Sequence, residues 1–376
     1  MAKDRLSQYA ALRQALLINK QRYGNDPRYR LDRVTDGFAE RAEPATDDTA
    51  LLERICAAYN KAVDKQQSAS AVFMPTHWWR LVSSGSLGPA IHALKNRDIK
   101  VLQSMYRNFF RDPCSAGLVG LPVNMSRSYF GLRIKTNYKH LLLGDALHQF
   151  DLWKERTGGR FTVHSLKSPR IGNPFGIIID GILVGIGAEY QHFYAQKIAS
   201  LLPPSQQRCV VSEIGGGYGG MAYYLIRDNP QCIYINFDLP ETIALASYYL
   251  LKSFPSLRAT LYGEAELNAQ TIAGSDMILM PNFEISRLPA ESIDVSFNSH
   301  LLADMEQSAI HTYLDEIMRT TRGHFLHLNR SQACETVSAY LSKKSRKLIF
   351  IESETARWHN ARSHQNDEIE QLYSVR

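Results

Sequence analysis

Residues 212–220 of this chain read SEIGGGYGG, with Ser212 at the start and Gly220 at the end. The stretch follows an apolar strand pattern and precedes a helix pattern, the setting in which a glycine-rich turn indicates a nucleotide-like ligand. Gly215, Gly217 and Gly219 allow sharp backbone turns, and they let a ligand approach main-chain N–H groups that a Cβ would block. The glycine loop therefore predicts a ligand site at the end of a strand.

Beyond residue 208 the chain alternates short apolar runs with helical patterns. Strand patterns lie at CVVSEI (209–214), CIYINFD (232–238), MILMPN (277–282), IDVSFNS (293–299) and HFLHLN (324–329). Helical patterns lie between them at 222–228, 241–253 and 310–321. Alternation of this kind is typical of a parallel sheet covered by helices on both faces, so we expect an α/β fold with a Rossmann-like core.

An acidic residue, Asp238, ends the strand that follows the glycine loop. It lies 23 residues after Gly215, where a carboxylate can accept hydrogen bonds from ribose hydroxyls. Gly215, Gly217 and Gly220 also satisfy the dinucleotide pattern GxGxxG. Glu213 favours S-adenosylmethionine (SAM) instead, because a carboxylate there suits an ammonium and a sulfonium and not an anionic pyrophosphate. In a third interpretation the glycines only permit close packing and Asp238 caps the next helix.

A second block, residues 278–305, reads as strand, loop, strand and helix. In a SAM site the loop after the third strand touches adenine, so Asn282 and Phe283 are predicted to supply an amide and an aromatic edge. Loop capping by Asn282 and core packing by Phe283 are the alternatives. Residues Asn298 to His300, at the tip of the fourth strand, are predicted to line the site of methyl transfer.

These motifs together resemble the sugar O-methyltransferase family. The resemblance is carried by NPFG (173–176), EIGGGYGGMAYYLIR (213–227), FDLPETIALASYYL (237–250) and FNSHLLADM (297–305). It covers residues 170–330, and it implies the class I SAM-dependent methyltransferase fold. It also implies that Glu213, Gly215, Gly217 and Asp238 occupy the SAM positions, and that the acceptor is a sugar of a polysaccharide, glycolipid, nucleotide sugar or antibiotic.

A sugar hydroxyl is a poor nucleophile, so a general base is expected, and histidine is the commonest choice. His300 stands at the end of the fourth strand, and Asp304 lies one helical turn further on if a helix has begun, so both are predicted to be catalytic. The HDW string of related small-molecule O-methyltransferases is replaced here by Ala303-Asp304-Met305. Three sources of the base stay open: His300, the N-terminal region, or a hydroxyl activated by a divalent metal on Asp304 or Glu284. No metal site is predicted from ligand spacing.

Pro203-Pro204 marks the predicted domain boundary. We divide the chain into a helical acceptor-binding region (1–170), a hairpin with a linking helix (171–204) and the SAM-binding domain (205–376). In the first region, helices are predicted at 51–63, as one unbroken helix at 91–109, and at 138–156. Asp180-Gly181 predicts a tight turn between two short strands, and residues 188–202 predict a helix.

Aromatic side chains of the N-terminal half are candidates for the acceptor site. Trp78 and Trp79 are neighbours and cannot both face one core from a regular element, so they either stack on a sugar ring or pack irregularly. Further aromatic residues are expected around SAM: Tyr190, His192 and Tyr194 as a cover, and Tyr218 near the methionine end. The basic stretch 127–135 suits either an anionic acceptor or a solvated surface.

Composition narrows the class of protein. The 376 residues are 44% hydrophobic and 21% charged, which excludes a disordered, collagen-like or coiled-coil chain. The net charge of +6 is scattered, so no nucleic-acid partner is predicted, and five cysteines without a CxxC pair indicate neither a disulfide framework nor a zinc site. The most apolar run, 175–187, is too short to span a membrane and no secretory pattern is present, so a cytoplasmic protein is expected.

Residues and resemblance together predict a SAM-dependent O-methyltransferase whose partner is a sugar-containing small molecule or glycan. One alternative is a dinucleotide-dependent oxidoreductase, which shares the glycine pattern. Another is a methyltransferase-like binding module without activity, which the missing HDW histidine favours. A homo-oligomer is compatible with the sequence, and the oligomeric state stays open.

Overall fold

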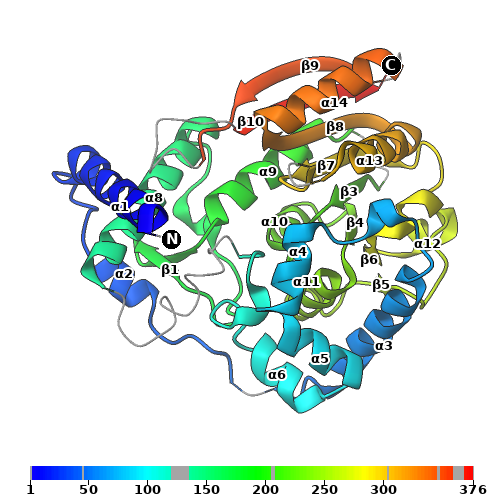
Figure 1. Ribbon diagram of the computed structural model, residues 1–376, viewed down its shortest axis with the longest axis horizontal. Coiled ribbons are helices and arrows are strands. Elements are labelled where there is room, and N and C mark those ends of the chain that lie inside the picture. Colours follow the sequence, from blue (N-terminus) through cyan, green and yellow to red (C-terminus); the bar gives the residue numbers. More distant parts are fainter. Residues whose placement is uncertain are drawn as a thin grey trace.

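The computed structural model describes residues 2–44, 46–119, 135–204, 208–302, 305–344, 348–358 and 368–375. The first part of the protein is mostly helical, as predicted. Its helices are α1 (Ala2–Tyr23), α2 (Asp32–Gly37), α3 (Thr49–Gln66), α4 (His77–Ser84), α5 (Gly88–Asn96), α6 (Ile99–Tyr106) and α8 (Thr136–Arg156), with 3₁₀ turns at Ala71–Phe73, Pro113–Ser115 and Val163–Leu166. In Figure 1, α1, α2 and α8 lie on the left, and α3, α5 and α6 lie along the lower edge.

The second part is built on one eight-stranded sheet with the order β5-β6-β4-β3-β7-β8-β10-β9. The strands in that order are Ala259–Leu261, Met277–Pro281, Ile233–Asp238, Val210–Ile214, Ile293–Ser299, Thr321–Arg330, Glu368–Val375 and Leu348–Thr355. The first six are parallel to one another, whereas β10 is antiparallel to both β8 and β9. Apart from the additional edge strand β5, the order of the other seven strands, with an antiparallel strand inserted before the last one, is that of the class I SAM-dependent methyltransferase fold. The predicted α/β, Rossmann-like core is therefore confirmed.

Helices cover both faces of the sheet, so the central strands β3, β4 and β7 are buried along nearly their whole length. These helices are α10 (Gly220–Asp228), α11 (Pro240–Ser253), α12 (Ala269–Gly274), α13 (Gln307–Thr320) and α14 (Ser331–Lys344), with a 3₁₀ helix, η4, at Asn282–Arg287. Neighbouring residues of β3 belong to two different cores, Val211 to one and Val210 to the other, as expected when side chains alternate across a sheet. All five predicted strands are present as β3, β4, β6, β7 and β8.

The hairpin and helix predicted before Pro203 are also present. β1 (Gly176–Ile179) pairs antiparallel with β2 (Ile182–Gly185), and the turn residues Asp180 and Gly181 have φ values of 49° and 76°. Positive φ at both positions is what a tight turn of this kind requires. The next helix, α9 (Ala188–Leu201), lies between the N-terminal helices and the sheet, and contacts α8, α10, β7 and β8.

One hydrophobic core joins the N-terminal helices to the helices of the sheet. Tyr106 packs against Tyr248 of α11, with ring centroids 5.3 Å apart. Asp48, just before α3, accepts hydrogen bonds of 2.9 Å from the Tyr248 hydroxyl and from Lys252 Nζ. The N-terminal region therefore forms a cover that is fixed to α11. The domain boundary at residue 204 stays a prediction.

The helix predicted over 91–109 is wrong as a single element. α5 ends at Asn96, and Arg97 then takes a left-handed conformation with φ of 55°. Asp98 starts the next helix by accepting a hydrogen bond from the backbone N–H of Val101. Arg97 and Asp98 therefore provide a C-cap and an N-cap that the periodicity of apolar residues does not reveal.

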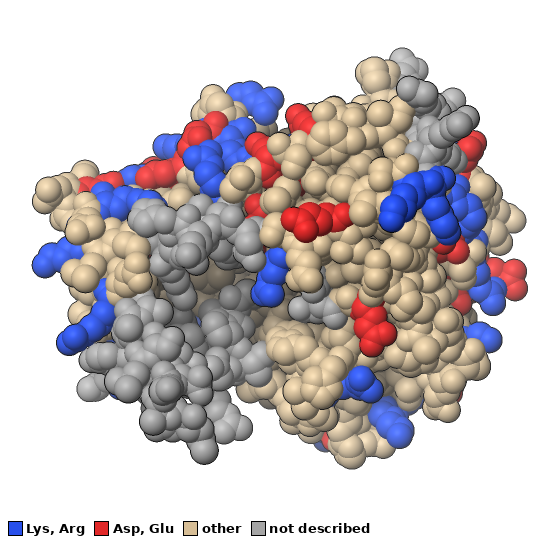
Figure 2. All heavy atoms as spheres, turned by 45° about the horizontal axis from the view of Figure 1, so that its top comes forward, with Lys and Arg blue, Asp and Glu red and all other residues tan. Residues whose placement is uncertain are grey.

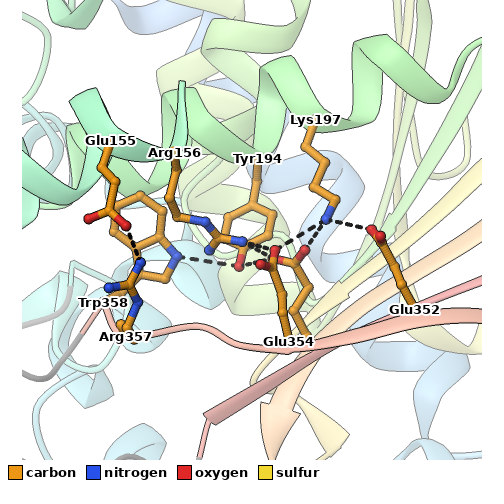
Figure 3. A network of polar contacts seen from close by, with 9 residues as sticks. Glu155, Arg156, Tyr194, Lys197, Glu352, Glu354, Arg357 and Trp358 are labelled. Carbon is orange, nitrogen blue, oxygen red and sulfur yellow. Dashed lines mark hydrogen bonds and ion pairs between the residues drawn. The ribbon is translucent and has the colours of Figure 1, made fainter. Parts of the chain in front are cut away.

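A polar network fixes α8 and α9 to the antiparallel edge of the sheet (Figure 3). Glu370 of β10 is 1% exposed, and it accepts hydrogen bonds from Tyr194 (2.5 Å) and Lys197, with Arg156 Nη2 at 3.4 Å. Burial alone would raise the pKa of Glu370, but Lys197 and Arg156 lower it below its usual value. Trp358 completes the group, because its indole N–H lies 3.4 Å from the Tyr194 hydroxyl.

The described surface carries charges of both signs. Figure 2 shows acidic and basic side chains spread over the same face. All five cysteines are buried and free. Among the helices formed by the described residues, none combines the length and the hydropathy that crossing a membrane demands.

Candidate functional site

A cavity of about 640 Å³ lies at the carboxyl ends of β3, β4 and β7. Its floor is formed by the glycine loop, the end of β4 and residues 299–301 at the end of β7. Residues 187–191, at the start of α9, lie on another side. The N-terminal region contributes residues 74–79, 117–119 and part of α8. Ligands of open α/β sheets bind at this place, where the strand order reverses: β4 lies on one side of β3 and β7 lies on the other.

The glycine loop takes a backbone course that other residues would resist. Gly215, Gly217 and Gly219 have φ values of 82°, 56° and 91°. A Cβ on Gly219 would lie 2.9 Å from the Leu250 side chain, whereas a Cβ on Gly217 would meet nothing within 4 Å. Gly217 lines the cavity, so the space beside it is available to a ligand. Gly219 has a packing role against α11.

Two carboxylates of the cavity have strongly shifted pKa values. Glu213 is 3% exposed, and it accepts a 2.5 Å hydrogen bond from the Tyr234 hydroxyl. Asp238 accepts hydrogen bonds from the backbone N–H of Gly217 (3.0 Å) and of Leu239 (2.7 Å). Loss of contact with bulk water raises the pKa of both carboxyls to about 7. Within the described part of the chain, neither has a lysine or arginine as an ion-pair partner.

Asn282, the residue predicted to contact adenine, lies in the cavity wall. Its Nδ2 donates to the Phe73 carbonyl (2.9 Å) and to the Tyr313 hydroxyl (3.0 Å), which fixes the amide. The buried Oδ1 of Asn282 has no hydrogen-bond partner among the residues that the structure describes. It is therefore an acceptor available to a ligand.

Phe283 and Asn298 do not lie where the sequence predicted. Phe283 packs edge-to-face on Tyr262, with centroids 5.7 Å apart, and is not among the described residues that line the cavity, because η4 turns its ring into the core. Asn298 is fully buried, and its Nδ2 donates to the Ile214 carbonyl (2.8 Å). Its Oδ1 accepts from Asn329 (3.0 Å), so Asn298 connects β7 to both neighbouring strands beneath the cavity.

His300, predicted to be catalytic, lines the cavity, and its relation to Asp304 stays a prediction. No helix has begun at His300, which has φ of 61°, and α13 starts only at Gln307. His300 Nδ1 lies 3.7 Å from Glu368 of β10, and 40% of the His300 side chain is exposed. Asp304 itself lies outside the described residues.

Of the three aromatic residues expected to cover SAM, only Tyr190 lines the cavity. The Tyr190 hydroxyl is hydrogen-bonded to Ser299 at the end of β7. His192 lies in the core and accepts from the Trp153 indole at 3.1 Å, and burial lowers its pKa to about 4. Tyr194 belongs to the Glu370 network. Tyr218 lines the cavity as expected, with its hydroxyl 2.9 Å from Gln191 Nε2.

The paired tryptophans both line the cavity from α4. Trp79 is held by a 3.0 Å hydrogen bond from its indole to Glu241, whereas Trp78 is 46% exposed.

Residues 127–134 of the basic stretch lie outside the described residues. The metal alternative gains no support from Glu284, which pairs with Arg287 at 3.2 Å. The described residues contain no group of three side chains suited to a metal ion.

Sequence reasoning missed several residues of the cavity, above all Glu189 and Trp358. Glu189 is 2% exposed, its Oε1 has no hydrogen-bond partner within the described part of the chain, and burial raises its pKa to about 8. A sequence signal existed, because Glu189 directly precedes Tyr190 in a helix expected to cover the site. Trp358 comes from the segment after β9, and nothing in the sequence indicates that it returns to the cavity.

Comparisons with known proteins concern the fold. A scan against family models and a search of curated proteins found no match. Among solved structures, the mitomycin 7-O-methyltransferase MmcR is 13% identical, with 50% of this chain and 55% of that one covered and a TM-score of 0.33. NodS, an N-methyltransferase from Bradyrhizobium japonicum WM9 solved with S-adenosyl-l-homocysteine, is 16% identical, with 48% and 85% covered and a TM-score of 0.32. PhzM, a pyocyanin biosynthetic protein, is 12% identical, with 63% and 72% covered and a TM-score of 0.36.

Proposed function

We propose that this protein is a SAM-dependent O-methyltransferase that methylates a sugar hydroxyl. The observation that carries the proposal is the pair of carboxylates, Glu213 and Asp238, beside the glycine loop. Their pKa values of about 7 mean that part of each is uncharged at neutral pH, because no cation compensates it. A ligand with an ammonium and a sulfonium would stabilise both ionised forms. A pyrophosphate would be repelled by them.

Two further features fit this cofactor. Gly217 leaves open the space that a Cβ would fill, so a ligand can lie against the main chain there. The unpartnered Oδ1 of Asn282 suits the amino group of adenine. Asp238, whose oxygens are already oriented by Gly217 and Leu239, would accept from the ribose hydroxyls. When bound, SAM supplies the activated methyl group, and the protein has to align the acceptor with it.

We assign the acceptor site to the N-terminal side of the cavity. The contribution of N-terminal residues to the cavity supports the proposed division into an acceptor-binding region and a SAM-binding domain. Trp79 is held in place by Glu241, and the exposed Trp78 offers an aromatic face to a sugar ring. Asp145 and Gln149 lie one turn apart on α8 and also line the cavity, so they present polar atoms to hydroxyl groups. The sugar itself is inferred from the resemblance of the sequence motifs.

Binding and transfer are tested in two steps. Calorimetry should detect binding of SAM and of S-adenosylhomocysteine (SAH) and no binding of NADH. Methyl-labelled SAM should then transfer label to a member of a panel of nucleotide sugars, with release of SAH. Binding of NADH without SAM would replace the proposal by an oxidoreductase. SAM binding without transfer to any sugar or glycan would favour the non-catalytic binding module.

A further inference from the structure

Two side chains in the first turn of α9 connect the glycine loop to the end of β7. Tyr190 is hydrogen-bonded to Ser299 at the end of β7, and Gln191 is 2.9 Å from the Tyr218 hydroxyl in the glycine loop. Glu189 stands on the same turn and lines the same cavity. This turn is therefore held between the loop assigned to SAM and the strand end assigned to methyl transfer.

Glu189 differs from its neighbours because one of its carboxyl oxygens, Oε1, has no hydrogen-bond partner among the described residues, although the carboxyl also makes a hydrogen bond with the backbone N–H of Glu189 itself. The residue is 2% exposed. A buried polar atom without a partner costs about 1–3 kcal/mol, so its retention needs an explanation other than stability. A ligand that occupies the cavity provides one.

Several acidic side chains line the cavity together with Glu189. No lysine or arginine is among the described residues that line the cavity. The titratable groups that line the cavity with Glu189 are Asp145 of α8, Tyr190 of α9, Glu213 of β3, Tyr218 of the glycine loop, Asp238 of β4, His300 after β7 and Tyr313 of α13, and Tyr224 of α10 lies close enough to interact electrostatically. Among the described residues that line the cavity, no lysine or arginine therefore supplies a positive charge to Glu189, whereas a cationic ligand would.

We propose that Glu189 receives the proton of the acceptor hydroxyl during methyl transfer, an inference that rests on the proposed function. The acceptor oxygen forms a bond to the methyl carbon while the carbon–sulfur bond of SAM breaks. The electron pair of that bond stays on sulfur, which becomes the neutral thioether of SAH. The hydroxyl proton passes to Glu189 Oε1, and the carboxylic acid later releases it to solvent. Charge and atoms balance without a metal or a redox partner.

This assignment makes the protonation state of Glu189 depend on whether SAM is bound. With the cavity free, burial keeps the pKa of Glu189 at about 8, so the group is mostly uncharged at neutral pH. A sulfonium nearby favours the carboxylate and lowers that pKa, whereas the neutral sulfur of SAH does not. Glu189 thus becomes a base when SAM is bound and returns to the acid form after transfer. His300, which lines the same cavity and lies 3.7 Å from Glu368, is the competing candidate for this base.

Proton release on binding tests this inference without an identified acceptor. SAM and SAH are titrated into the protein at pH 8 in buffers of different ionisation enthalpy. At this pH, Glu213 and Asp238 are largely ionised and Glu189 is about half protonated, so SAM should release about half a proton more than SAH. Glu189→Gln should abolish the difference between the two ligands. The surface variant Glu266→Gln should preserve it.

The outcomes separate this inference from the proposed function. If neither ligand binds the wild-type protein, the proposed function fails. If both bind with equal proton release, or if the difference persists in Glu189→Gln, the role of Glu189 is overturned and SAM binding stands. Should Glu189→Gln not fold, the infrared spectrum of wild-type protein with ¹³C-labelled glutamate decides, since a protonated carboxyl band must be present with SAH and weakened with SAM. With an acceptor in hand, Glu189→Gln should lower kcat about 100-fold or more at unchanged SAH affinity.

Discussion

The carboxylate of Asp238, at the end of β4, accepts the backbone N–H of Gly217 at 3.0 Å. This hydrogen bond joins the two most informative sequence signals, the glycine loop and the acid that follows it, which are 21 residues apart. It fixes the loop at the point where the main chain borders the cavity. It also orients the carboxylate that we assign to the ribose of SAM.

Replacement of Asp238 should weaken cofactor binding. Asp238→Ala removes a charged acceptor and releases the loop N–H of Gly217, so SAM affinity should fall by about 1–3 kcal/mol. Calorimetry at pH 7.5 measures the change. Glu266→Ala, at an exposed carboxylate far along the chain, is the control and should leave affinity unaltered. Equal affinities in wild type and Asp238→Ala would remove Asp238 from the site.

Two glycines allow the effect of strain to be separated from the effect of blocking the site. Gly217 and Gly158 have φ values of 56° and 61°, and a Cβ on either would meet nothing within 4 Å. Alanine should therefore cost each site a similar amount, about 1–2 kcal/mol of stability. Only Gly217→Ala should lose SAM binding, because only Gly217 borders the cavity. Thermal melts with and without SAH compare the variants, and normal ligand protection in Gly217→Ala would contradict the assignment.

Tyr234 should set the pH range of SAM binding. Its hydroxyl donates to Glu213 and lowers the pKa of that carboxyl, which burial raises to about 7. Tyr234→Phe should move this pKa upward, so that less Glu213 is ionised at pH 7. SAM affinity should then be reduced at pH 7 and approach the wild-type value at pH 9. Tyr340→Phe, which removes a hydroxyl bonded to Asp315 on α13, serves as the control. Affinity curves that run parallel across pH would argue against a role for Glu213.

Glu189 should make the ligand-free protein less stable at alkaline pH. Its pKa rises from 4.5 in the unfolded chain to about 8 in the fold, so the folded state binds the proton more tightly. Stability from this group is complete below pH 4.5 and is lost as pH rises through about 8. Glu189→Gln should therefore melt at least about 2 °C higher than wild type at pH 8.5, with a smaller difference at pH 5. A difference independent of pH would mean that Glu189 is not protonated in the fold.

The Glu370 network should matter more for stability than the exposed pair beside it. Glu370→Gln leaves Lys197 and Arg156 without their buried counter-charge and should cost about 3 kcal/mol or more in urea unfolding. Glu155, in an exposed ion pair with Arg357 at 2.6 Å, provides the matched change. Glu155→Gln should cost less than about 1 kcal/mol. Similar costs for the two variants would show that burial adds nothing to this network.

The sequence predicted those parts of the fold that depend on local patterns. The glycine loop, Asp238 and the five strands that became β3, β4, β6, β7 and β8 were recognised from apolar runs and their flanking residues. β10 was not recognised, because its Glu370 becomes compatible with burial only through Lys197 and Arg156, which are remote in sequence. The break at Arg97 was missed because the apolar spacing continues across it.

The site was predicted as far as it follows strand ends. Glu213, Asp238, Asn282 and His300 line the cavity because each lies at or just after the carboxyl end of a strand. Phe283 was misplaced, since the direction of a loop side chain depends on the packing of η4. Trp358 reaches the cavity only through the course of the segment after β9, which no local pattern records, whereas Glu189 was overlooked although its helix was expected to cover the site.

The position of SAH in a crystal of its complex tests the central claim most directly. The account predicts electron density for SAH along Gly217, with the ribose hydroxyls within hydrogen-bonding distance of Asp238 and the ammonium on the side of Glu213. A cavity that stays empty at saturating SAH, or one that binds NADH with its pyrophosphate against the glycine loop, would contradict it.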